Sequence, residues 1–80
     1  MLKEKPVEVT ALSDHNLLIV FSNGERRLFD VKPYINGSWY GKLADDCFFR
    51  TVRIAGNTVE WADGQDIAPH ELYELSIPCN

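Results

Sequence analysis

Alternating hydrophobic and polar positions predict β-strands in the first part of the chain. In residues 7–11 the apolar side chains of Val7, Val9 and Ala11 alternate with polar ones, which indicates a strand with one face in solvent. Residues 17–21 are apolar at every position. We therefore expect a central strand that is covered on both faces.

Turn residues connect these segments into an antiparallel meander. Residues 13–16 read Ser-Asp-His-Asn, and Asp and Asn side chains can hydrogen-bond the neighbouring backbone in a turn. Asn23-Gly24 is typical of a two-residue hairpin turn in which both residues adopt a positive φ angle. Residues 25–31 then return as a third strand, with hydrophobic side chains directed to the core.

The second half of the chain combines an irregular segment with another hairpin. Residues 32–49 contain Pro and Gly turn signals, and Asp45 is placed to cap a short middle helix. Residues 51–55 alternate in the manner of a strand. We expect them to pair with residues 58–62 across a hairpin turn at Gly56-Asn57.

The closing stretch predicts a tight turn followed by a C-terminal helix. Asp63-Gly64 has the same positive-φ character as the first hairpin turn. Pro69 suits the first helical position, because its φ angle is already helical and it has no N–H group to satisfy. With Ala68 as the N-cap, Ile67 and Leu72 form the N′ and N4 pair of a hydrophobic staple.

These elements predict a single α+β domain over residues 1–80. We expect an antiparallel sheet of about five strands in two hairpin groups, with a short middle helix and a C-terminal helix on one face. The composition agrees with this, because 45% of the residues are hydrophobic and include two Trp, three Tyr and four Phe. A chain of this length needs those side chains to form its one small core.

The net charge of −4 has the wrong sign for a general nucleic-acid binder and gives no attraction to anionic membranes. The longest apolar run, residues 17–21, is far shorter than the roughly 20 residues of a membrane span. Residues 1–9 contain lysines but no apolar stretch of the kind found in signal peptides. We therefore expect a cytoplasmic protein that does not associate with membranes.

The cysteines and histidines give little reason to expect a disulfide or a metal site. Cys47 and Cys79 are far apart in the sequence and no secretion signal accompanies them. Together with His15 and His70, they show none of the short paired spacings that present metal ligands. We expect free cysteines, solvated histidines, no metal and no cofactor.

No group of residues resembles a catalytic centre. Asp63 and Asp66 could be viewed as a carboxylate pair, but turn chemistry explains the first and proximity to a helix start explains the second. The serines lack a nearby histidine or nucleophile-elbow glycines, and the glycines are scattered singly. We therefore expect no catalytic residues and no enzymatic activity.

Two adjacent aromatic residues, Trp39 and Tyr40, lie in the irregular segment between Gly37 and Gly41. As a plug, the pair would cover the open face of the small sheet, which is the interpretation favoured for a domain that needs every large side chain. As an interface anchor, the pair would be exposed and would contact a protein partner. The sequence leaves both alternatives open.

Four arginines offer a different interpretation. Arg26, Arg27, Arg50 and Arg53 could share one face of the sheet if their strands are neighbours. In an acidic chain such residues are most often a solvated surface in local charge balance. As an alternative, the arginine strip would contact nucleic acid.

The order of motifs along the chain resembles that of a known bacterial family. An apolar strand ending in Asn-Gly (residues 17–24) precedes the strand Phe29-Asp30-Val31, and an L-x-D-x-x-x-F segment covers residues 43–49. The closing motif, V-x-W-x-[DN]-G-x-D-[IL]-x-P-x-x-L-Y-E, is met by residues 59–74. This pattern is similar to that of domain of unknown function 2442 (DUF2442), with Ala68 standing where a better-capping Ser or Asp is expected.

The resemblance implies a small α+β fold and, in some members, a gene context like that of an antitoxin in a two-gene pair. It implies no catalytic residues. We accordingly expect a non-catalytic protein-interaction module, a monomer or weak homodimer that contacts an unidentified protein partner through Trp39 and Tyr40. The alternative is a nucleic-acid-contacting regulator that uses the arginine strip.

Overall fold

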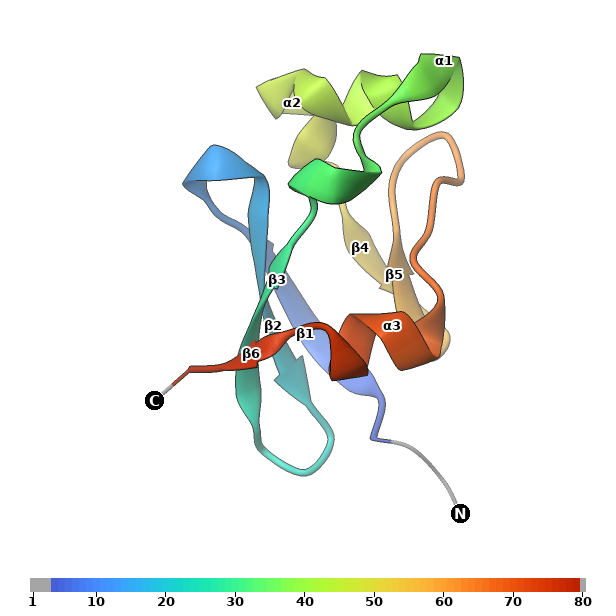
Figure 1. Cartoon of the computed structure of the whole chain (residues 1–80). Coiled ribbons are helices and arrows are strands. Elements are labelled where there is room, and N and C mark those ends of the chain that lie inside the picture. The colour runs from blue at the N-terminus through green and yellow to red at the C-terminus, as the bar shows by residue number, and fades with distance from the viewer. Residues whose placement is uncertain (1–3, 80) are drawn as a thin grey trace.

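A computed structural model of the chain describes residues 4–79; residues 1–3, part of the N-terminal segment considered above, and residue 80 lie outside that range. The fold is α+β, as predicted, with an antiparallel four-stranded sheet, a two-stranded sheet and short helices (Figure 1). The larger sheet has the strand order β1 (Pro6–Ala11), β2 (Asn16–Phe21), β3 (Arg26–Asp30) and β6 (Ile77–Pro78). The smaller sheet pairs β4 (Arg53–Ala55) with β5 (Thr58–Glu60).

Within residues 4–79, three short α-helices and three single-turn 3₁₀ helices connect these strands. The α-helices are α1 (Gly37–Tyr40), α2 (Asp46–Phe49) and α3 (Pro69–Glu74). The 3₁₀ turns are η1 (Ser13–His15), η2 (Lys32–Tyr34) and η3 (Gly41–Ala44). Over residues 4–79, none of the helices has both the length and the apolar character that crossing a membrane requires.

The central strand β2 is buried on one face only. Leu17, Ile19 and Phe21 are at most 1% exposed, whereas Leu18 and Val20 between them are partly exposed. The prediction of a strand covered on both faces is therefore wrong. The reason is visible in Figure 1, where α3 and the β4–β5 hairpin lie on the same side of the larger sheet.

A β-bulge changes which residues of β1 face the core. Pro6 pairs with Phe21 and Glu8 pairs with Val20, so Val7 is an extra residue between two paired positions. Val7 is consequently 48% exposed, contrary to the alternation that the sequence shows, and Pro6 is buried instead. Beyond the bulge the predicted alternation holds, with Val9 and Ala11 packed against the core.

The Asn-Gly and Asp-Gly turns have one more residue than predicted. At the second of them, Trp61 N–H donates to the Gln65 carbonyl (2.8 Å) and Gly64 N–H donates to the Trp61 carbonyl (2.9 Å). This closes a three-residue loop in which the positive φ belongs to Gly64 (+100°) and not to Asp63. The turn after β2 has the same bonds and a φ of +90° at Gly24, whereas Gly56-Asn57 forms the predicted two-residue turn.

The core is a single cluster to which β2 contributes three side chains, while β3, η3, α2, β5, α3 and the segments next to them contribute the others. Its largest members are Trp61, which is 0% exposed, and three buried phenylalanines. The indole N–H of Trp61 donates to the Phe49 carbonyl at 2.9 Å, so the polar atom of this side chain is satisfied inside the core. The buried set is Leu17, Ile19, Phe21, Phe29, Val31, Leu43, Phe49, Val59, Trp61, Ile67 and Leu72.

The helix ends agree with the predicted capping residues. The Asp45 side chain accepts a hydrogen bond from Phe48 N–H at 3.0 Å and caps α2. Helix α3 begins at Pro69 with Ala68 as its N-cap, and the staple residues Ile67 and Leu72 are both buried. Beyond α3 the chain forms β6 beside β3, a strand that no sequence pattern predicts.

We expect Gly64→Val to destabilise the protein by about 1 kcal/mol or more, because a β-branched residue is strained at a φ of +100°. The measurement is the free energy of unfolding in urea. Gly41→Ala is the matched control, since Gly41 has a φ of −59° and free space around its Cα. Equal stability of the two variants would contradict the assigned turn.

Candidate functional site

Trp39 lies on the surface and does not plug the sheet. Its side chain belongs to α1 and is 48% exposed, which makes it one of the few exposed large hydrophobic residues among residues 4–79. The core cluster contains Leu43, Phe49 and Trp61, which are fully buried, and it does not include Trp39. The favoured interpretation of Trp39 as a core plug is therefore wrong, and the exposed alternative describes this residue.

Tyr40, by contrast, is partly buried and packs against the core. Its hydroxyl donates a hydrogen bond to the Asp66 carbonyl at 2.8 Å. The structure thus separates the two adjacent aromatic residues, because Tyr40 anchors the segment while Trp39 faces solvent.

Contacts with the Trp61–Gln65 turn fix the position of Trp39. The side-chain amide of Gln65, which is fully buried, donates to the Trp39 carbonyl at 2.9 Å. A Cβ atom on Gly64 would lie 3.9 Å from Cζ2 of Trp39, so the indole lies over the glycine of this turn. The Gln65 Oε1 atom has no hydrogen-bond partner within residues 4–79.

Two opposite charges border the indole ring. The Lys42 ammonium lies 5.8 Å from the ring centroid, near the outer limit of a cation–π contact. The same group forms an ion pair of 2.6 Å with Asp63. We call the exposed area formed by Trp39, Lys42, Asp63 and Gly64 the Trp39 surface.

The structure does not bring the four arginines into one strip. Arg26 pairs across the sheet with Val20 and Arg27 with Ile19, so neighbouring arginines of β3 lie on opposite faces. Arg53 belongs to the second sheet and forms an ion pair of 2.6 Å with Glu60. Arg50, at the end of α2, forms an ion pair of 2.8 Å with Asp46, which raises the Arg50 pKa.

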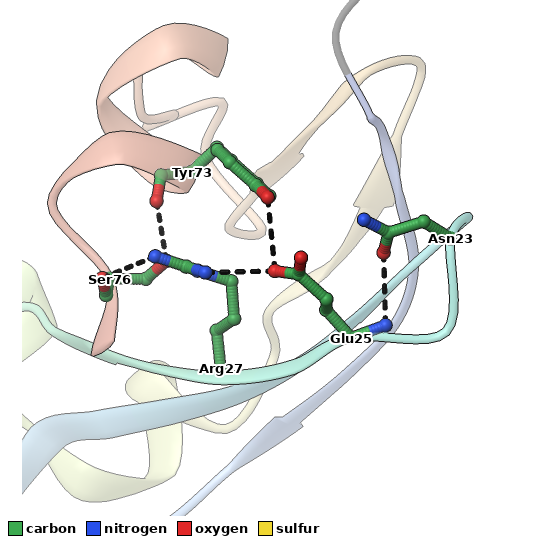
Figure 2. A network of polar contacts seen from close by, with 5 residues as sticks. All are labelled: Asn23, Glu25, Arg27, Tyr73 and Ser76. Atoms are coloured by element: carbon green, nitrogen blue, oxygen red, sulfur yellow. Dashed lines mark hydrogen bonds and ion pairs between the residues drawn. The ribbon is translucent and has the colours of Figure 1, made fainter. Parts of the chain in front are cut away.

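Arg27 has a structural role on the core-facing side of the sheet (Figure 2). Its Nε donates to the Ser76 hydroxyl at 2.6 Å, an Nη donates to the Ser76 carbonyl at 2.9 Å, and the other Nη donates to Glu25 at 2.8 Å. The guanidinium also lies 4.4 Å from the centre of the Tyr73 ring. These contacts attach the segment after α3 to β3.

Glu25 completes this network. It accepts from Arg27 and from the Tyr73 hydroxyl (3.0 Å), and its backbone N–H donates to the Asn23 side chain at 2.9 Å. The hydrogen bonds from Arg27 and then from Tyr73 lower the pKa of the Glu25 carboxyl below its ordinary value of 4.5. No sequence pattern identifies this group, since Glu25 and Tyr73 are separated by 48 positions.

A second tyrosine–carboxylate contact joins η2 to α3. The Tyr34 hydroxyl donates to Glu71 at 2.8 Å. Burial, and next the hydrogen bond to Glu71, raise the pKa of Tyr34 to about 12. Glu71 is the third residue of α3, where the sequence places an acidic side chain near the positive end of the helix.

The histidines and the cysteines that were considered as metal ligands do not come together in one site within the described part of the chain. His15 is partly buried, contrary to its expected solvation: its Nε2–H donates to the Ala44 carbonyl at 3.1 Å and its ring packs edge-on against Phe49. Cys47 and Cys79 are free, as expected. Over residues 4–79, no three His, Cys, Asp or Glu side chains come together in a way that could hold a metal ion.

We expect Glu25→Gln to reduce the loss of stability in acid. Because the folded-state pKa of Glu25 is depressed, its contribution is present above the unfolded value of 4.5 and is lost as the pH falls through the folded value. The measurement is the urea midpoint at neutral pH and at several pH values below 4.5.

Arg27→Gln should weaken the same acid dependence, since the hydrogen bond from Arg27 is the main cause of the lowered pKa. An acid dependence that is identical in wild type and in Glu25→Gln would contradict this assignment.

Comparison with known protein families gives a match over nearly the whole chain. Residues 6–78 match the family described as "Protein of unknown function (DUF2442)". No curated protein and no solved structure matches the chain. The matched range begins with β1 and ends with β6, and it contains all the motifs that carried the resemblance. The chain therefore belongs to the DUF2442 family of proteins, whose function is unknown.

Proposed function

We propose that this protein is a cytoplasmic, non-catalytic module that binds another protein through the Trp39 surface. The observation that carries the proposal is an indole that remains 48% exposed although its backbone is held in place. Exposed tryptophans contribute disproportionately to the energy of protein interfaces. A small domain that needs its aromatic residues for the core has a reason to expose one when a partner covers it.

The surroundings of Trp39 favour binding because they are already ordered. Gln65 holds the Trp39 carbonyl, and Tyr40 holds the next residue to the Asp66 carbonyl. Ordering a loop during binding costs conformational entropy. A side chain on a backbone that is already fixed avoids most of this cost and binds more tightly. Lys42 and Asp63 beside the ring supply the charged rim that usually surrounds an apolar anchor.

Two of the titratable residues considered in the sequence, Asp63 and His15, have structural partners, which supports a non-catalytic role. Asp63 is paired with Lys42, and His15 donates to a backbone carbonyl beside a buried ring. A protein-binding module would suit the antitoxin-like role in a two-gene pair that the family resemblance implies. The nucleic-acid alternative has less support, because Arg27, Arg50 and Arg53 are each paired with a carboxylate and do not share one face.

Trp39→Ala should leave the protein folded, with a loss of about 1 kcal/mol or less, because its side chain is half exposed. Trp61→Ala should cost about 3–5 kcal/mol, since it empties the largest site in the core and removes a hydrogen bond to Phe49. Circular dichroism and urea unfolding of both variants provide the measurement. An unfolded Trp39→Ala variant would show that Trp39 is a core residue.

To test binding, the tagged protein is purified from its host cell together with the partner that it retains. The purified partner is then titrated with wild type and with each variant. We expect Trp39→Ala to raise the dissociation constant about 30-fold, which corresponds to a loss of about 2 kcal/mol of binding free energy. Leu75→Ala is the matched control, because Leu75 is an exposed hydrophobic residue (61%) outside the Trp39 surface. Equal affinities of wild type and Trp39→Ala would refute the proposed docking surface.

A further inference from the structure

The larger sheet has an outer face that is opposite the core. Leu18 pairs with Leu28 across β2 and β3, and Leu28 pairs with Ile77 of β6, so these three form an apolar row on that face. Val20 lies in the next row. Leu18, Val20 and Leu28 are partly exposed and Ile77 is 67% exposed. Within residues 4–79 these four lie outside both the core cluster and the hydrophobic side chains that pack on it.

Two opposite charges border the apolar centre of this face. Glu8 of β1 pairs with Val20, and Val20 pairs with Arg26 of β3, so the acid and the base occupy one row with Val20 between them. Their strands are two strand spacings apart, about 10 Å, which is too far for a direct ion pair. Both residues are exposed, and neither side chain makes an ion pair or hydrogen bond within the described range 4–79.

The lack of an ion pair at Arg26 within residues 4–79 distinguishes it from the other arginines. Arg27, Arg50 and Arg53 each form an ion pair of 2.6 to 2.8 Å with a carboxylate of the same chain. Arg26 therefore differs from the other arginines of the described segment in having its guanidinium available to a second molecule.

We propose that a second copy of this chain packs against the outer face, with a two-fold axis that runs along β2. Rotation about such an axis leaves the position of each residue along the strand direction unchanged. It places β1 of one copy opposite β3 of the other. Glu8 of each copy then lies opposite Arg26 of the other, which forms two equivalent ion pairs. Leu18 and Val20 lie on the axis and meet their own equivalents.

Charge complementarity selects this axis over the other two-fold arrangement of the same faces. An axis perpendicular to the strands, at the height of Ile19, would place Arg26 opposite Leu28 and Glu8 opposite Thr10. That packing would remove both charges from water without a partner, which is unfavourable. Aligned sheets cross at about 30°, an offset that the long side chains of Glu8 and Arg26 can span.

The size of the face predicts a weak dimer. Three strands of five or six residues and the two-residue strand β6, each about 4.8 Å from the next, cover at most roughly 15–20 Å in each direction. The area of this face lies at or below the lower end of the range for specific interfaces, so we expect a dimer dissociation constant on the order of 10–100 µM. The Trp39 surface belongs to α1, η3 and the Trp61–Gln65 turn and not to this face, which leaves it free for a different partner.

The test is sedimentation velocity over a concentration series, with circular dichroism to verify folding. Wild type should pass from monomer to dimer. Arg26→Glu and Glu8→Arg should each weaken dimerisation about tenfold or more, because each places like charges opposite one another. The double variant Glu8→Arg/Arg26→Glu should restore it, since the exchange re-creates both ion pairs. Lys42→Glu, a charge reversal on the Trp39 surface, is the matched control and should dimerise like wild type.

A wild-type protein that remains monomeric up to about 1 mM would overturn the proposal. Dimerisation that is unaffected by the single reversals would overturn it as well. So would a folded double variant that does not recover the dimer, because reciprocal rescue depends on Glu8 facing Arg26 across the two-fold axis.

Discussion

The inward side chains of β2, Leu17, Ile19 and Phe21, have almost no contact with solvent, and α3 and the second sheet pack on the face that they occupy. A short chain buries a smaller share of its surface than a long one. Few residues are therefore available to cover the core-facing side of the sheet. Apart from Gln65 Oε1, the buried polar side-chain atoms of residues 4–79 have hydrogen-bond partners within the same small volume. The Trp61 indole donates to the Phe49 carbonyl, and Arg27 is surrounded by Glu25, Tyr73 and Ser76.

The local signals of the sequence describe much of this architecture. Asp45 and Pro69 mark the starts of α2 and α3, and the glycines at 24, 56 and 64 occupy the positive-φ positions of three hairpin turns. The sequence leaves open which faces of each strand are buried, and the packing of the other elements on the sheet decides this. A continuous apolar run is compatible with a strand buried on both faces or with one that has an exposed hydrophobic face, and residues 17–21 are of the second kind.

Two further features have no local signal. The bulge at Val7 reverses the expected orientation of that residue, because one extra residue changes the alternation on the N-terminal side of it. The strand β6 consists of two residues, too few for any periodic pattern, and its pairing with β3 depends on contacts such as that between Arg27 and Ser76.

The candidate site could be predicted in part. The sequence identifies Trp39 and Tyr40 as the residues to examine, but the position of each depends on Gln65 and Asp66, which lie 26 residues away. The arginine strip could have been questioned from the sequence alone, since Arg26 and Arg27 are neighbours in one strand and must lie on opposite faces. The network around Glu25 depends on tertiary contacts that only the folded chain reveals.

The contact between Arg27 and Ser76 can form only late in the synthesis of the chain. Ser76 follows Arg27 by 49 residues, an interval of about 2–10 s at ribosomal elongation rates of roughly 5–20 residues per second. Until then β3 is an uncovered edge, and the Arg27 guanidinium on its core-facing side lacks its two contacts with Ser76, although β1 and β2 have already been made. An open edge of this kind can pair with other nascent chains. The arrival of β6 therefore closes an edge of the sheet at which another chain could otherwise pair.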